Sequence, residues 1–156
     1  FNLLAELIET SIEVKANIVK QDPTEKGIRK ALNLGHTIGH AFESYSHKTN
    51  RPILHGYAVA WGLIGELFLS YKLQGFPQSV MTETVRFIRE NYGVFEITCN
   101  DYPALYEYMA HDKKNATAGE INFTLLKGIG DIVPNCIVEQ ELIYQALDFY
   151  RDSVGI

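Results

Sequence analysis

LNLGHTIGHAFE, residues 32–43, is the stretch that decides the fold of this chain. On a helical wheel its apolar side chains gather on one side, which predicts a helix that buries this side in the core. A glycine inside a helix costs about 1 kcal/mol relative to alanine. Gly35 and Gly39 nevertheless share one narrow edge of the wheel, and we expect another backbone to approach closely there. The side chains expected in the core belong to Ala31, Leu34, Ile38, Ala41 and Phe42.

The helix around this stretch is expected to run from about Pro23 to Tyr45. In the preceding DPTEKG segment, Asp22 suits the N-cap position and Pro23 the first helical position. Glu25 then falls where the glutamate of a capping box would lie. We therefore predict one continuous helix that carries both histidines of the stretch.

The remaining pattern predicts a mostly α fold, a helical domain of about six helices with one small β-hairpin near residues 120–138. Two runs of β-favouring residues flank a glycine-rich turn in that segment. No internal repeat, low-complexity tract or linker divides the chain, so residues 1–156 are interpreted as one domain. The other helices are expected at residues 2–20, 54–74, 77–93, 101–111 and 140–153.

The composition excludes several classes of protein. A formal net charge of −5 and a pI near 5.5 argue against nucleic-acid binding, which needs a basic face. No apolar run reaches the roughly 18 residues that span a bilayer, and the closest, residues 58–70, is interrupted by Glu66. Cys99 and Cys136 lie far apart and form no CxxC motif, which favours a reducing cytoplasm over a disulfide framework. We therefore expect no nucleic-acid partner, no membrane partner and a cytoplasmic location.

A row of polar side chains follows one face of the predicted helix. Arg29, Asn33, His36 and His40 are spaced i, i+4, i+7 and i+11, which places them within about 60° of one another. They could form a solvated face, but such faces usually use Lys, Glu and Gln, which favour helices more. We favour the wall of a cleft that presents a cation, an amide and two imidazoles. The HxxxH spacing could also place two nitrogens on one metal ion, although the glutamate of an HExxH site is missing.

A further histidine, His55, begins the apolar helix expected at residues 54–74. A lone histidine in that place could be a helix cap or a buried core residue. Beside His36 and His40 in a neighbouring helix, it becomes a candidate metal ligand. Catalytic zinc sites use three protein ligands and leave one position open. The sequence thus predicts a zinc-type site that still lacks one carboxylate ligand.

Three segments resemble the C-terminal domain of the 3-dehydroquinate synthase family, namely KANIVKQDPTEKGIRKALNLGHTIGHAFE, LHGYAVAWGL and HDKKN. The resemblance implies a lyase of the shikimate pathway, in chorismate and aromatic amino-acid biosynthesis. This family converts 3-deoxy-arabino-heptulosonate 7-phosphate to 3-dehydroquinate and phosphate, and uses NAD and a divalent metal, Zn²⁺ or Co²⁺. The chain has no GxGxxG phosphate loop, so the N-terminal NAD-binding domain is expected upstream and absent from this chain. The resemblance also implies a small sugar-phosphate acid as substrate and a homodimer of the full-length enzyme.

The resemblance implies roles for individual residues as well. His36 and His55 match the metal ligands, whereas His40 matches a histidine that contacts substrate, which contradicts a joint HxxxH chelate. The residues implied in catalysis are His40, Lys15 and Asn33. Those implied in substrate binding are Arg29, Asn33, His40, Lys113 and Glu25, with Lys114 left open as the alternative to Lys113.

Two departures from the family pattern matter. The third metal ligand of the family, a glutamate in an AExxK element, is expected upstream, so the isolated fragment is expected to be inactive. Tyr57 stands where the family has the glutamate of LHGE. The alternatives are another sugar-phosphate cyclase, a metal-dependent polyol dehydrogenase domain, or a helical interaction module with a structural zinc or none.

Overall fold

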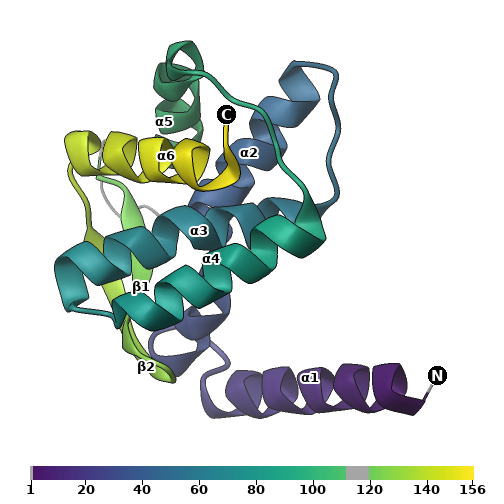
Figure 1. Ribbon diagram of the computed structural model, residues 1–156. Helices are drawn as coiled ribbons and strands as arrows, with labels where there is room; N and C mark the ends of the chain where they lie inside the picture. Colours follow the sequence, from purple (N-terminus) through teal and green to yellow (C-terminus); the bar gives the residue numbers. More distant parts are fainter. Residues whose placement is uncertain (1, 112–119) are drawn as a thin grey trace.

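The computed structural model describes residues 2–111 and 120–156 as a set of packed helices with one β-hairpin (Figure 1). The expected mostly α architecture with a single hairpin is confirmed. No helix among the described residues is both long enough and apolar enough to cross a bilayer. The elements are α1 (Asn2–Gln21), η1 (Ile28–Asn33, a 3₁₀ helix), α2 (His36–Lys48), α3 (His55–Gln74), α4 (Gln78–Tyr92), η2 (Cys99–Asp101, 3₁₀), α5 (Tyr102–Ala110), β1 (Asn122–Gly128), β2 (Asp131–Ile137) and α6 (Gln140–Val154).

Helix α3 lies at the centre of the fold and packs against α2, α4, α6 and β1 (Figure 1). Its sequence is apolar on nearly every side, which is the pattern of a helix surrounded by other elements. Leu54 precedes the helix, and Gly75 ends it in the left-handed conformation, with φ 73°. Among the buried residues of α3, Glu66 is the one with a charged side chain, and it is 0% exposed. The core around α3 therefore contains a carboxylate.

The predicted continuous helix over residues 23–45 is wrong. The chain forms η1 instead, leaves it at Leu34, and begins α2 only at His36. The break lies at Gly35, whose φ of 79° is in the left-handed region that an α-helix cannot contain. The helical-wheel prediction placed Gly35 in the interior of a helix. In the structure, its left-handed conformation separates η1 from α2.

The segment before η1 also differs from the predicted capping box. The carboxylate of Asp22 accepts backbone N–H bonds from Lys26 at 3.0 Å, from Gly27 at 2.7 Å and from Arg29 at 3.1 Å. These hydrogen bonds lower the pKa of Asp22 below its usual value, and the bond from Gly27 has the largest effect. Glu25 has φ 57°, which is not a helical conformation. Asp22 thus stabilises a turn ahead of η1 and does not cap a helix that begins at Pro23.

The glycine edge of α2 receives another backbone, as expected. A Cβ added to Gly62 of α3 would lie 2.2 Å from the carbonyl oxygen of Gly35 and 2.6 Å from the nitrogen of Gly39. The two helices are therefore in backbone contact at this point. The expected core residues Ile38, Ala41 and Phe42 are buried. Ala31 and Leu34 are only partly buried, because they belong to η1 and the turn after it.

The hairpin β1–β2 is antiparallel and packs through β1 on α3. Its register shifts between Phe123 and Leu125, opposite the segment that holds Pro134 and Asn135. Proline lacks an N–H and is tolerated in strands at such irregular positions. Helix α1 lies apart from the other helices, and its main packing partner among the described elements is η1 (Figure 1). Its apolar side chains are more than half exposed at Leu3, Leu4, Leu7, Ile8, Ile12 and Val14.

Candidate metal centre

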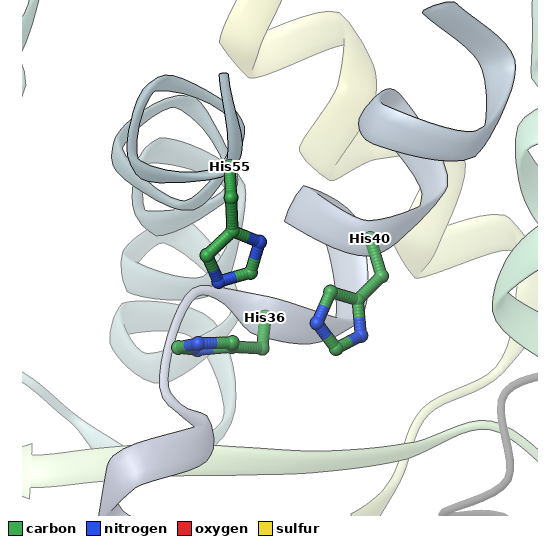
Figure 2. Close-up of side chains that lie close together, drawn as sticks. All are labelled: His36, His40 and His55. Atoms are coloured by element: carbon green, nitrogen blue, oxygen red, sulfur yellow. The ribbon is translucent and has the colours of Figure 1, made fainter. Parts of the chain in front are cut away.

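Three histidines meet where α2 and α3 begin (Figure 2). His36 opens α2, His40 follows one turn later, and His55 opens α3. The ring centroids lie 5.3 Å apart for His36 and His40, and 5.4 Å apart for His36 and His55. The rings of His40 and His55 are 5.7 Å apart. The convergence follows from the Gly35–Gly39–Gly62 contact, which draws the two helices together beside the imidazoles.

The first histidine is oriented by its own backbone. The Nδ1 atom of His36 lies 3.0 Å from the carbonyl oxygen of Leu34, which is the geometry of an Nδ1–H donor. Leu34 is the residue at which the chain leaves η1, so the helix break supplies this acceptor. A histidine whose Nδ1–H is engaged in this way presents Nε2 as its metal-binding atom.

The third histidine is oriented by a carboxylate. The Nδ1 atom of His55 lies 3.0 Å from Oε2 of Glu43, so Nε2 is again the atom that can bind a metal. The pair is half open to solvent, with His55 53% and Glu43 30% exposed at their side chains. The sequence interpretation missed Glu43, although it follows His40 by three residues and so lies on the same helix face.

Tyr57, which stands where the family has the glutamate of LHGE, faces other aromatic rings. The Tyr57 ring lies 5.8 Å from that of Trp61 and 5.6 Å from that of Tyr92, measured between centroids. Tyr57 therefore packs along the α3–α4 side. The carboxylate that contacts His55 comes from Glu43 on α2.

The three histidines fit a divalent transition metal. One nitrogen from each lies within 4.8 Å of the other two, and within residues 2–111 and 120–156 they form the group that could hold an ion. Zn–N bonds of about 2.0–2.1 Å in a tetrahedral site require nitrogens about 3.3 Å apart, so the rings would close slightly around an ion. Neutral imidazole suits Zn²⁺ and the neighbouring late first-row ions. The donor set therefore accommodates the metal that the sequence implies.

The predicted substrate-anchoring residues lie in and before η1. The amide nitrogen of Asn33 donates to Oε1 of Glu25 at 2.6 Å. The guanidinium of Arg29 donates through Nη1 to the carbonyl oxygen of Pro23 at 2.9 Å, and its Nε lies 4.0 Å from Oε2 of Glu25. Glu25 thus contacts both residues. Because η1 and α2 are separate helices, the predicted polar row is not one helix face, and it bends at Gly35.

A polar cavity of about 300 Å³ adjoins this cluster between η1, α2 and the hairpin. The side chain of Lys30 donates to Asn135 Oδ1 there and so links η1 to β2. None of the three histidines lines the cavity. Its lining residues are Glu25, Lys30, Asn33, Thr37, Asn122, Phe123, Thr124 and Asn135.

Of the predicted lysines, Lys15 is the one in the described part of the chain, and it does not belong to this cluster. Lys15 is exposed on α1, beside the apolar side chains of Leu7, Ile8 and Ile12. Lys113 and Lys114 lie outside the described residues. The described part of the chain therefore brings together His36, His40 and His55, and separately Arg29, Asn33 and Glu25.

Comparison with known proteins gives concordant results. A family model described as 3-dehydroquinate synthase C-terminal matches residues 2–115. A 3-dehydroquinate synthase of Parabacteroides distasonis is 54% identical over 156 residues, which are 100% of this chain and 44% of that protein. A 3-dehydroquinate synthase of Leptospira interrogans is 39% identical over 145 residues, 93% of this chain and 39% of that protein. The chain thus spans less than half the length of these curated relatives.

Solved structures share the fold. The crystal structure of 2-deoxy-scyllo-inosose synthase complexed with carbaglucose-6-phosphate, NAD⁺ and Co²⁺ superposes with a TM-score of 0.76. The sequence identity is 23%, and the match covers 94% of this chain and 41% of that one. At this identity the likeness concerns the fold.

Proposed function

Because the chain belongs to the 3-dehydroquinate synthase C-terminal family, we propose that it is the metal- and substrate-binding domain of a 3-dehydroquinate synthase. The full-length protein then converts 3-deoxy-arabino-heptulosonate 7-phosphate to 3-dehydroquinate and phosphate. We assign NAD binding mainly to the part of the relatives that this chain does not cover. We also propose that the full-length enzyme is a cytoplasmic homodimer.

The observation that carries this proposal is the convergence of the histidines from α2 and α3 inside the segment that matches the family. We propose His36 and His55 as metal ligands through Nε2. The Leu34 carbonyl and the Glu43 carboxylate then fix the two rings. When bound, the metal supplies a Lewis acid that polarises a substrate oxygen. His40, one turn further along α2, is proposed to hydrogen-bond substrate beside the ion.

Substrate capture is proposed for the residues around η1. The Arg29 guanidinium is a planar fork that suits the two oxygens of the substrate carboxylate. Asn33 adds an amide donor and acceptor next to it. The contacts of Glu25 with both side chains hold them together before substrate arrives. Lys15, on α1, and Lys113, outside the described residues, are proposed to add positive charge for the anionic substrate and to complete the set.

Turnover by the full-length protein tests the proposal. Release of phosphate and 3-dehydroquinate from 3-deoxy-arabino-heptulosonate 7-phosphate is expected, without net formation of NADH. Glucose 6-phosphate and sedoheptulose 7-phosphate should give no product, whereas turnover of either would indicate another sugar-phosphate cyclase. Net NADH release would indicate a polyol dehydrogenase.

A matched pair of histidine variants links the activity to the site. His36→Ala is expected to abolish turnover and to weaken metal binding. His47→Ala, on the exposed side of the same helix, should change neither. Full activity of His36→Ala would instead favour an interaction module in which the histidines play no catalytic part.

A further inference from the structure

The charged residue inside the core stands next to the candidate metal centre. Glu66 interrupts the apolar sequence of α3, and its side chain is 0% exposed. A carboxylate removed from water is strongly unfavourable unless it is paired or hydrogen-bonded. A glutamine or an apolar residue would avoid this cost, so the bonds that the carboxylate makes indicate what it does.

Both oxygens of Glu66 bind the first turn of α2. Oε2 accepts the backbone N–H of Gly35 at 2.6 Å, and Oε1 accepts that of Ile38 at 3.1 Å. These N–H groups lie at a helix N-terminus, where the backbone lacks its own acceptors and favours a negative charge. Gly35 occupies the N-cap position and has no side chain to serve as the cap. Glu66 supplies from α3 the cap that α2 lacks.

The two bonded residues flank a proposed metal ligand. His36 follows Gly35 directly and lies two positions before Ile38, so its backbone is held on both sides. One turn earlier on α3, Gly62 touches the backbone of Gly35 and Gly39. The start of α2 is thus attached to α3 at two successive turns. His55, the first residue of α3, belongs to the helix that makes both attachments.

We propose that Glu66 is a positioning residue of the metal centre: its buried carboxylate clamps the first turn of α2 and thereby aims His36 at the ion shared with His55. The inference rests on the proposed function, because it takes His36 as a metal ligand. In this role Glu66 acts through the backbone of the turn, by its bonds to Gly35 and Ile38, and is not itself assigned as a metal ligand or a substrate contact. Glu66→Gln keeps the shape of the side chain but places an N–H₂ group against at least one backbone N–H donor.

The decisive measurement is metal affinity in the full-length protein, with Co²⁺ as the probe. Glu66→Gln is expected to weaken Co²⁺ binding about tenfold or more, as outer groups that orient ligands commonly do. The visible absorption of the bound Co²⁺ should also change, since the geometry of one ligand changes. A loss of fold stability alone would alter neither the spectrum of the loaded protein nor its affinity relative to a matched control.

Ser70→Ala provides that control. Ser70 is equally buried on α3, one turn after Glu66, and it accepts the N–H of Leu126 at 3.0 Å. The variant should lower the melting temperature but leave the Co²⁺ affinity within about twofold of wild type. Wild-type affinity and spectrum in Glu66→Gln, or equal losses in both variants, would overturn the inference.

His36→Ala separates this inference from the proposed function. Unchanged Co²⁺ affinity in His36→Ala would remove the metal centre and with it the role of Glu66. If His36→Ala loses much of its Co²⁺ affinity while Glu66→Gln loses none, the assignment of the metal centre stands and only the role of Glu66 is refuted.

Hydrogen exchange in the wild-type protein gives a second test that needs no variant to fold. Metal binding should slow exchange at the Gly35 and Ile38 amides more than at the Leu126 amide, because binding and clamping stabilise the same turn. Equal slowing at all three amides, or none, would overturn the inference.

Discussion

Alanine at Gly62 would place a methyl group in the backbone contact between α2 and α3. The added Cβ would lie 2.2 Å from the Gly35 oxygen, 2.6 Å from the Gly39 nitrogen and 3.0 Å from the Gly39 Cα. All three atoms belong to the backbone and cannot move away by changing a rotamer. The helices would therefore have to separate by about 1 Å to restore ordinary contact distances.

The expected loss of stability follows from two opposing terms. Overpacking of a close contact destabilises by about 1–3 kcal/mol, and contact with backbone atoms favours the upper end. Replacing a helical glycine by alanine raises the unfolding free energy by up to about 1 kcal/mol, through its higher helix propensity. Gly62→Ala should therefore lose about 2 kcal/mol of unfolding free energy. Gly56→Ala, in the same helix but with no atom within 4 Å of the added Cβ, should gain about 0.5 kcal/mol.

Chemical and thermal unfolding of both variants provide the assay. The difference of about 2.5 kcal/mol corresponds to a gap of about 5–10 °C between their melting temperatures. Separation of the helices should also weaken metal binding in Gly62→Ala, since His36 and His55 lie on the two helices that move apart. Equal stability of the two variants, or a more stable Gly62→Ala, would refute the backbone contact.

Three further outcomes are expected. Glu43→Gln should weaken metal binding about 10–100-fold, because the carboxylate that fixes the His55 ring is lost; competition with a metal chelator measures this, and unchanged affinity would contradict it. Arg29→Lys in the full-length enzyme should lower kcat/KM about tenfold, because a point charge replaces a fork that makes two charged hydrogen bonds; steady-state kinetics with an unchanged value would remove the anchoring role. Asp22→Asn should destabilise the protein at pH 7. Because the folded-state pKa of Asp22 is lowered, its contribution is present above its ordinary value of 3.8 and disappears as the pH falls through the folded value, so the difference from wild type in urea unfolding should vanish in acid.

Regular apolar patterns made most of the fold predictable. Helix α3 was expected at residues 54–74 and runs over His55–Gln74, since a long apolar segment ended by a glycine has few other solutions. The hairpin followed from two β-favouring runs around a glycine-rich turn. The close approach at Gly35 and Gly39 was also expected, because small residues on one edge leave room for a backbone.

The break at Gly35 was not predictable from periodicity. A helical wheel assumes right-handed φ and ψ at every position, and glycine is the residue that adopts the left-handed region at no steric cost. The predicted capping box failed for a related reason. Asp22 accepts bonds from three N–H groups up to seven residues ahead, a turn that the local DPTEKG pattern does not specify.

The residues that orient the histidines were identified only from three-dimensional contacts. Glu43 contacts His55 across two helices and twelve residues, and Glu66 reaches Gly35 across 31 residues. Both were visible in the sequence only as a glutamate on the histidine face and a glutamate in an apolar helix. A buried or aligned carboxylate near candidate ligands is the signal that could have identified them.

The metal site shared by α2 and α3 can be tested on the structure of the zinc-loaded full-length protein, with anomalous scattering measured at the zinc edge. One zinc ion is expected, with the Nε2 atoms of both His36 and His55 at about 2.0–2.1 Å. Glu43 is expected to keep its bond to the Nδ1 atom of His55. A zinc ion bound away from these two rings, or held by His36 and His40 with His55 turned aside, would refute the shared site.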